Sequence, residues 1–407
     1  MLTLEAAQTR ILAALTPAVS ASPGLEKVPL MDALNCVLSA DVVAPLDLPP
    51  FDNSAMDGYA VRAADVVGAS PEKPVALRLV GRVAAGEVFA GEVGTGECVR
   101  LFTGSPFPRG ADAVVMQEDT RVEASSAGVV GLLDGVKPWE NVRLRGEDVK
   151  CGETLLRVGE RLTAGRMGLC AALGFAEVTV TRRPVVGLLA TGSELRAAGA
   201  PLGPGEIYES NRALLAPLVR AAGAEARLYP LVLDTAEATS AALERALAEC
   251  DAVITSGGVS VGEFDFVKSA FEQLGGTLDL WKVAIKPGKP FVFGRLNGKC
   301  LFGLPGNPIS ALVTFLLLVR PALLKLQGAS EMFLPSHPAS LAEPLVNRGD
   351  RRHFMRVWVD AEGRVHPVGM QASHALGALA AANGLVDVPP CTTWPAGSAV
   401  RVLRWEF

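Results

Sequence analysis

The chain has 407 residues, of which 49% are hydrophobic and 20% are charged, and its formal net charge is −5 at pH 7. This length exceeds what one hydrophobic core usually serves, so we expect several domains, and the composition excludes an intrinsically disordered chain. The negative charge, without any basic run, disfavours a general nucleic-acid binder.

The cysteines indicate reduced thiols, because all seven are spread singly along the chain and form no C-x-x-C pair. We therefore expect neither a disulfide framework nor a zinc site. The N-terminal segment 1–21 is amphipathic and has no apolar signal-peptide core. The longest apolar run, 309–319, is too short to span a bilayer. We expect a cytoplasmic protein that binds neither nucleic acid nor a membrane.

The first part of the chain predicts one helix and then a β-rich insertion. Apolar residues recur at helical spacing within 3–20, and a proline-rich segment at 45–50 then ends regular structure. From 46 to 140, short β-type runs alternate with glycine-rich turns, which is typical of a small inserted β domain. A helical run from 165 is followed by a strand at 177–180.

The segment from 184 to about 328 alternates strands and helices. This rhythm predicts a parallel sheet, with ligands bound at the carboxyl ends of its strands. We expect strands at 185–190, 226–233, 252–254, 278–283, 290–294 and 300–303, and helices at 210–222, 235–249, 267–274 and 309–319. Short strands return from 329 to the C-terminus, at 354–359, 385–388 and 399–405.

The expected fold class is a multidomain α/β and β protein. A central parallel-sheet α/β domain carries an inserted small β-rich domain and is followed by a β-rich C-terminal domain. The expected domains are a discontinuous helical and linking domain (1–45 plus 141–180), the inserted domain (46–140), the α/β domain (181–328) and the C-terminal domain (329–407).

Two loops at predicted strand ends carry candidate ligand groups. Thr191-Gly192-Ser193-Glu194 follows the first α/β strand, and its Ser-Glu ending excludes a Walker phosphate loop. The segment 255–265 follows the third strand and contains Ser256, Gly257, Gly258 and Ser260, whose hydroxyls and amides suit a phosphate. Its carboxylates Glu263 and Asp265 suit Mg²⁺. Each loop alone can be a simple turn, but their shared sheet edge favours a ligand site.

Two further segments favour an anion. Lys286 and Lys289 are separated by Pro287-Gly288 and closed by Pro290, a rigid bracket that a solvated surface pair would not need. The segment 304–308 (LPGNP) leads into the helix at 309–319, so its amides and Ser310 lie at a helix N-terminus, which attracts anions.

Other polar segments do not decide the function alone. Within 51–60, Asp52 and Asp57 can reach a ligand or cap turns, and 101–106 and 145–148 are similarly ambiguous. The four histidines have no metal-ligand spacing. The absence of G-x-S-x-G, H-E-x-x-H and G-x-G-x-x-G patterns disfavours standard hydrolases, zinc proteases and dinucleotide enzymes.

Taken together, these segments resemble the molybdopterin molybdenumtransferase family, the MoeA type that includes the gephyrin E domain. The resemblance covers nearly the whole chain. It rests on FDNSAMDGYA (51–60), 102–104, RGED (145–148), TGSE (191–194), YESNR (208–212), SGGVSVGEFD (256–265), KPGKP (286–290), LPGNP (304–308) and 371–385. Ser193 departs from the pattern, because aspartate is common there in the family.

The resemblance implies a transferase that inserts molybdate into adenylylated molybdopterin, hydrolyses the adenylate and releases AMP to form molybdenum cofactor. It also implies Mg²⁺ and a homodimer with a shared active site, and the molybdopterin adenylyltransferase is a possible partner. The residues implied near nucleotide and metal are Asp57, Thr103, Asp148, Glu194 and Asp265, with Glu194 and Asp265 as metal ligands. Those implied to face the pterin phosphate or molybdate are Lys286, Lys289, Ser310, Arg356 and Ser373. The remaining binding residues are Thr191, Gly192, Ser256, Gly257, Gly258, Ser260, Pro305 and Gly306.

Three alternatives stay open at this stage. One is a molybdopterin adenylyltransferase, which shares the α/β domain, although the flanking domains favour the insertion enzyme. Another is a tungstate-inserting enzyme, since sequence does not separate the two oxyanions. The third is a scaffold or binding module without catalytic activity, which the lack of an additional fused domain disfavours.

Overall fold

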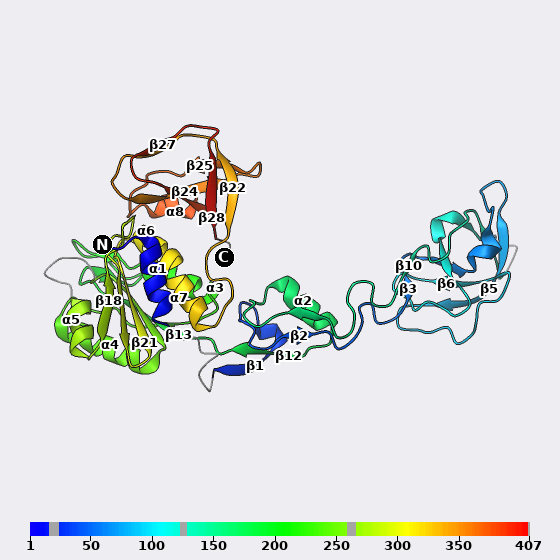
Figure 1. The fold of residues 1–407 in the computed structure, drawn as a ribbon, viewed down its shortest axis with the longest axis horizontal. Coiled ribbons are helices and arrows are strands. Elements are labelled where there is room, and N and C mark those ends of the chain that lie inside the picture. The colour runs from blue at the N-terminus through cyan, green and yellow to red at the C-terminus, as the bar shows by residue number, and fades with distance from the viewer. Residues whose placement is uncertain (16–23, 123–127, 259–265, 406–407) are drawn as a thin grey trace. The chain divides into compact units, whose positions relative to one another are not determined.

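A computed structural model describes residues 1–15, 24–122, 128–258 and 266–405 (Figure 1). The chain divides into two compact units. The first unit contains Met1–Ala40, Arg157–Gly168 and Phe175–Phe407, and the second contains Asp41–Leu156 and Leu169–Gly174. The predicted four-part domain division remains a proposal within this frame.

The first unit contains a six-stranded sheet in which one strand runs against the others. Its strand order is β16 (Glu225–Leu228), β13 (Val185–Ala190), β17 (Ala252–Ser256), β21 (Lys299–Leu304), β20 (Val292–Leu296) and β18 (Thr277–Trp281). The first four strands are mutually parallel, as predicted, whereas β20 is antiparallel to both neighbours. Only Asn297 and Gly298 join β20 to β21, both at positive φ. A two-residue Asn-Gly turn makes a hairpin, so the expectation of a wholly parallel sheet is wrong at this edge.

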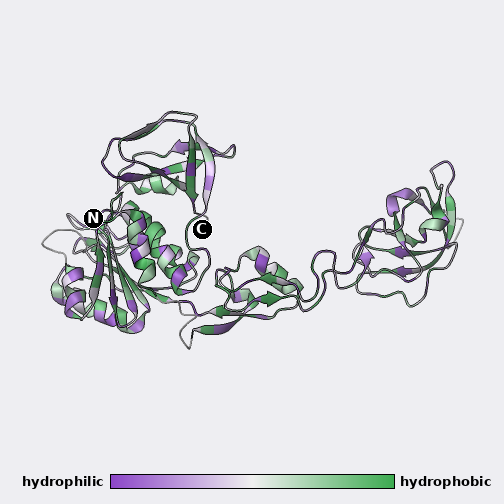
Figure 2. Ribbon diagram, in the orientation of Figure 1, coloured by the Kyte–Doolittle hydropathy of each residue, from purple (hydrophilic) through white to green (hydrophobic). Residues whose placement is uncertain are grey.

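Helices cover both faces of this sheet, because each carries an apolar stripe that must be buried. One core cluster joins the sheet to α1, α3, α6, η5 and α7, and a second joins it to α4 and α5. Figure 2 shows hydrophobic residues along these strands and on the helices packed against them. The helices are α1 (Leu4–Ala13), α3 (Asn211–Ala221), α4 (Ala236–Glu249), α5 (Phe266–Gln273), α6 (Pro308–Thr314), the π-helical η5 (Phe315–Val319) and α7 (Arg320–Leu326).

The continuous helical segment Pro308–Leu326 is the most apolar part of the first unit. By length and composition alone it could cross a membrane, but 83% of its most apolar 18-residue stretch is buried inside the protein. Such burial is what the core helix of a folded domain shows, because its side chains already pack against protein.

The C-terminal part of the first unit is a closed β structure. Its strand order is β19, β24, β25, β22, β28 and β26, and an additional pairing of β24 with β26 closes the sheet on itself. The strands are β19 (Ile285–Lys286), β22 (Ser336–Leu341), β24 (Arg352–Val359), β25 (Arg364–Pro367), β26 (Gly384–Val388) and β28 (Ala399–Arg404), with β23 (Leu345–Asn347), β27 (Thr392–Trp394) and helix α8 (Leu376–Ala380) beside them. Lys286, the second residue of β19, is also the first residue of the KPGKP segment (286–290), so this sheet reaches that segment.

Small elements complete the first unit. They are β1 (Leu25–Pro29), which pairs with β12 (Glu177–Thr181), the 3₁₀ turn η2 (Leu30–Asp32), and β14 (Leu195–Arg196), which pairs with β15 (Ile207–Tyr208). Asp251 ties this region to the sheet, because it accepts hydrogen bonds from the Arg182 guanidinium (2.8 and 3.1 Å) and from the N–H of Val185 (2.7 Å).

The second unit is built around a β sheet of its own, with the order β7, β4, β6, β5, β9 and β8. Its core consists of two small apolar clusters, one on each face. The strands are β4 (Gly58–Val61), β5 (Val75–Val83), β6 (Glu97–Leu101), β7 (Ala113–Met116), β8 (Thr120–Arg121) and β9 (Val129–Leu132). The second unit also contains the pairs β2 (Val42–Val43) with β11 (Thr154–Leu156) and β3 (Asn53–Ser54) with β10 (Val142–Arg143), and the turns η3 (Ala63–Val66) and η4 (Gln117–Asp119). Helix α2 (Ala164–Ala172) contributes residues to both units.

Candidate active site

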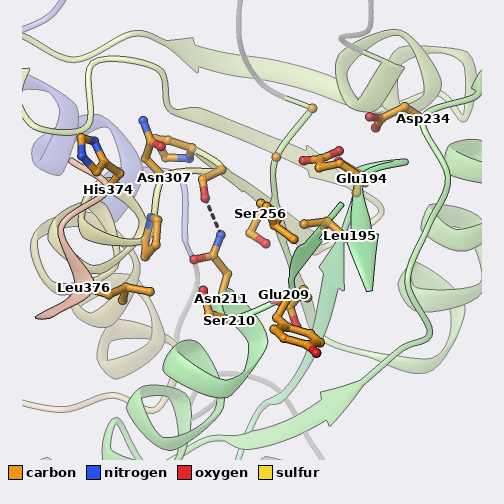
Figure 3. A pocket seen from close by; sticks show the side chains of 18 of the residues that line it. Glu194, Leu195, Glu209, Ser210, Asn211, Asp234, Ser256, Asn307, His374 and Leu376 are labelled. Carbon is orange, nitrogen blue, oxygen red and sulfur yellow. Dashed lines mark hydrogen bonds between the residues drawn. The ribbon is translucent and has the colours of Figure 1, made fainter. Parts of the chain in front are cut away.

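A cavity with a volume of about 670 Å³, here called the main cavity, lies in the first unit. It opens where β13, β17 and β21 end, as expected for a sheet whose parallel strands point their carboxyl ends to one edge. Figure 3 shows its side chains, with Glu194 and Asp234 on one side and Asn307 and His374 on the other. The predicted residues Thr191, Glu194, Ser256, Gly257, Gly258, Pro305 and Gly306 all line it.

The loop after β13 places a carboxylate in the main cavity. Glu194 lines the cavity beside Asp234, which follows the predicted second strand. Ser193 joins these two segments, because its N–H donates to the Asp234 carboxylate (3.3 Å) and its hydroxyl accepts from the N–H of Asp234 (3.2 Å). Gly192 leaves no room for a side chain, since an added Cβ would lie 2.7 Å from Leu195 Cγ. Local packing therefore fixes the backbone beneath Glu194.

The loop after β17 requires its two glycines. Gly257 and Gly258 have φ of 92° and 62°, and a Cβ on Gly257 would lie 2.6 Å from the carbonyl oxygen of Thr191. The N–H of Gly257 donates to the carbonyl of Leu304 at 3.1 Å. This amide is therefore already paired, because its proton holds β17 to β21, and the assignment of Gly257 to phosphate binding stays a prediction. Ser260, Glu263 and Asp265 lie outside the described residues.

Three buried oxygens at the main cavity have no hydrogen-bond partner within the described parts of the chain: Thr191 Oγ1, Ser256 Oγ and Asn211 Oδ1. The two ends of the Asn211 amide can be told apart. The Gly306 carbonyl can only accept a hydrogen bond, so the amide atom 2.7 Å from it is the nitrogen and the other is the oxygen. Unpartnered buried polar atoms are costly. Their concentration here indicates a wall that a polar ligand or water completes.

The cation-bearing residues gather at a second cavity of about 500 Å³, here called the lysine cavity. Lys286 lines it together with His353, its cross-strand partner in the β19–β24 pairing. Arg356 is fully buried beside them. The other predicted lysine, Lys289, is exposed and lines neither cavity. The structure thus separates two lysines that the sequence places three residues apart.

The electrostatics of the lysine cavity favour an anion. The guanidinium of Arg356 donates to the carbonyls of Met370 and Ala372, and its Nε and Nη1 have no partner among the described residues. Burial lowers the pKa of Arg356 below its usual range. Burial, together with the positive charges of Lys286, Arg356 and Arg351, lowers the pKa of His353 to about 4. His353 is therefore neutral at pH 7 among cations.

The segment 371–374 connects the two cavities, because Gln371 lines the lysine cavity and His374 lines the main cavity. The Asn307 side chain, which lines the main cavity, donates to Ser373 Oγ at 3.0 Å, and the N–H of Ile309 donates to the Ser373 carbonyl at 3.1 Å. Ser310 is buried in the first turn of α6, and a Cβ on Gly288 would lie 3.6 Å from its carbonyl oxygen. Ser310 and Ser373 therefore lie where the KPGKP and LPGNP segments meet.

The remaining predicted residues, Asp57, Thr103 and Asp148, belong to the second unit, which is described by itself. Thr103 donates to Asp57 Oδ1 through its N–H (2.8 Å) and its hydroxyl (2.9 Å). These hydrogen bonds lower the pKa of Asp57. Asp148 is exposed, and its N–H donates to the carbonyl of Leu48 at 3.0 Å. Asp57 and Thr103 are thus adjacent, as a shared role requires.

A divalent cation would find two of its preferred oxygen ligands in the main cavity. Glu194 and Asp234 both present carboxylates there, although no cluster of three metal-ligating side chains occurs within the described ranges. The sequence interpretation missed Asp234 and Asn211. Asp234 directly follows the strand predicted at 226–233, so the rule that ligands lie at strand carboxyl ends would have found it. Asn211 opens a predicted helix, where a polar side chain has ordinary capping roles.

Comparison with known proteins agrees with this geometry along the whole chain. The MoeA N-terminal region (domain I and II) matches residues 2–174, the probable molybdopterin binding domain matches 187–325, and the MoeA C-terminal region (domain IV) matches 338–405. The molybdopterin molybdenumtransferase 2 of Mycobacterium tuberculosis is 43% identical over 370 residues, covering 89% of this chain and 90% of that protein. The chain belongs to the molybdopterin molybdenumtransferase family.

Further members of the family support the same assignment. The enzyme of Haemophilus influenzae is 40% identical over 388 residues, covering 94% of this chain and 93% of its own. The solved structure of the molybdopterin biosynthesis MoeA protein from Pyrococcus horikoshii OT3 has a TM-score of 0.79 at 31% identity and covers 100% of both chains. The predicted family, the multidomain α/β and β fold and the transferase class are therefore confirmed.

Proposed function

We propose that the protein inserts molybdate into adenylylated molybdopterin and releases AMP. The observation that carries this proposal is the segment 371–374, which runs from the cation-rich lysine cavity at Gln371 to the carboxylate-bearing main cavity at His374. The hydrogen bond from Asn307 to Ser373 holds this segment in place. The substrate carries an anhydride-linked nucleotide and must meet a dianion. A site that binds the nucleotide anhydride and the molybdate dianion in separate regions, both held on rigid elements, suits a reaction between them.

The main cavity would bind the adenylylated pterin. Its polar wall of Thr191, Ser256 and Asn211 would orient the substrate, and Glu194 with Asp234 would hold Mg²⁺ against the anhydride. When bound, Mg²⁺ would neutralise charge on the leaving AMP. Asp265, which lies outside the described residues, stays a candidate third ligand.

The lysine cavity and its margin would bind molybdate. Lys286 and Arg356 supply positive charge, and the neutral His353 supplies one ring N–H that can donate to an oxyanion oxygen. Ser310 and Ser373 would position the oxyanion near the main cavity. An oxygen of molybdate or water then attacks the pterin-side phosphorus of the anhydride. The bond from that phosphorus to the bridging oxygen breaks, and AMP leaves with the bridging oxygen. This chemistry requires no nucleophilic side chain.

Asp57, Thr103 and Asp148 would complete the site from the second unit of a partner chain in a homodimer. The substrate is made by a molybdopterin adenylyltransferase, and we propose that enzyme as a transient partner in the cytoplasm. The support for these assignments is the compact Asp57–Thr103 pair, which presents a carboxylate and a hydroxyl on an exposed edge.

The decisive experiment measures AMP release from adenylylated molybdopterin with molybdate, with tungstate and with neither. We expect release that depends on molybdate and Mg²⁺. Failure with both oxyanions contradicts the transferase proposal, and equal rates with tungstate assign a broader oxyanion specificity. Glu194→Gln should raise the Mg²⁺ concentration needed for half-maximal release, with Glu177→Gln, an exposed carboxylate on β12, as the matched control.

A further inference from the structure

Two arginines lie opposite each other on the sheet of the second unit. In the parallel pairing of β5 with β6, Arg82 is the register partner of Arg100. Like charges placed directly opposite on a sheet face destabilise it. The same strand pair offers a contrast, because Arg78 is in register with Glu97 and forms an ion pair with it. One cross-strand site is therefore neutralised, whereas the other holds two positive charges.

The two guanidinium groups share one aromatic ring. Arg82 Cζ lies 5.0 Å from the centroid of the Phe102 ring, and Arg100 Cζ lies 5.2 Å from the same centroid. Arg100 also lies over Tyr59, at 4.9 Å. Stacking on aromatic faces holds a planar guanidinium in place and leaves its edge N–H groups free to donate. The pair is thus positioned by packing rather than by carboxylates.

The hydrogen-bonding groups of the two arginines are not equally used. Arg100 donates to the carbonyl of Gly58 (3.2 Å) and to the Gln117 side chain. Arg82 is exposed and, within the described parts of the chain, has neither an ion pair nor a side-chain hydrogen bond. It therefore has donors available for a ligand. The nearby Asp57 carboxylate already accepts two hydrogen bonds from Thr103.

We propose that Arg82 and Arg100 form a phosphate-binding pair on the inserted sheet. A stacked arginine with a free planar edge, as Arg82 has, suits the oxygens of a phosphate ester or anhydride, which accept two parallel N–H bonds, and Arg100 adds a second positive charge. The pair adjoins Phe102-Thr103, so a phosphate bound there lies beside the Asp57–Thr103 site. This assignment rests on the proposed function, in which the substrate brings a nucleotide phosphate to that site.

The test compares ligand binding by the full-length protein and by single variants at low salt. Arg82→Ala should weaken the binding of AMP about tenfold or more and leave adenosine unchanged, since the loss of a hydrogen bond to a charged group has at least about this effect. The affinity of Arg82→Lys for AMP should lie between those of the wild type and Arg82→Ala, because lysine keeps the charge but not the planar stack. Arg78→Ala is the matched control, on the same strand but already paired with Glu97, and should bind AMP within about twofold of wild type.

Inorganic pyrophosphate separates the two sources of the phosphate group. An equal loss of pyrophosphate and AMP affinity in Arg82→Ala assigns the pair to any phosphate, and a loss confined to AMP assigns it to the nucleotide. Unchanged affinity for both ligands, or an equal loss for adenosine, overturns the proposal. These measurements need no turnover, so they are separate from a failure of AMP release with molybdate, which would contradict only the proposed function.

Discussion

Gly257→Ala should destabilise the first unit and displace the wall of the main cavity. Gly257 has φ of 92°, a conformation that an alanine adopts only under strain of roughly 1–3 kcal/mol. The added Cβ would lie 2.6 Å from the carbonyl oxygen of Thr191, so one backbone segment must move as well. Overpacking of this kind adds about 1–3 kcal/mol. We expect a total loss of roughly 2–6 kcal/mol in the free energy of unfolding.

The matched control is Gly306→Ala in the same cavity. Its Cβ would meet only the Cα of Gly257, at 3.7 Å, and its φ is not positive. This variant should keep the free energy of unfolding within about 0.5 kcal/mol of wild type. Urea unfolding, followed by tryptophan fluorescence and circular dichroism, measures both variants. Equal stability of Gly257→Ala and Gly306→Ala would refute the argument that backbone conformation, rather than side-chain chemistry, requires the first glycine.

Three further substitutions test charges and hydrogen bonds in the first unit. Burial alone would raise the pKa of Asp251, but hydrogen bonds from Arg182 and the N–H of Val185 hold it below its usual value. Asp251→Asn should therefore cost about 1 kcal/mol at pH 7, with the difference disappearing in urea titrations as the pH falls through the folded pKa. The folded pKa of His353, about 4, lies below its unfolded value, so protonation favours unfolding as the pH falls below about 6.5. His353→Gln should remove up to about 3 kcal/mol of that acid sensitivity, and an unchanged pH profile would contradict the burial argument. Asn211→Ala should cost about 1 kcal/mol in the same assay, because the Gly306 carbonyl loses its donor.

Local patterns predicted most elements of the fold correctly. The alternation of strands and helices located α3 and α4 within one residue of their observed starts, and apolar runs located β13, β17 and β21. The cavity at the strand ends also followed from sequence, because parallel strands bring successive loops to one edge. Thr191–Glu194 and Ser256–Gly258 meet there as expected.

Features that depend on contacts distant in sequence were not predictable in the same way. The direction of β20 depended on the Asn297-Gly298 turn, a local signal that was overlooked. The separation of Lys286 from Lys289 depends instead on the pairing of β19 with β24, more than 60 residues downstream. The use of the Gly257 N–H by Leu304 likewise requires knowledge of which strand lies beside β17.

The helical segment Pro308–Leu326 begins at the main cavity and ends deep in the protein. Pro308 borders the cavity, whereas the side chains of η5 and α7 fill the core that α1 and α3 share. Because a helix is stiff along its axis, repacking of its buried end shifts the residues at its start. Substitutions in this segment should therefore act on the main cavity at one end and on the core at the other. A screen for inactive variants should recover core positions there that never contact a ligand.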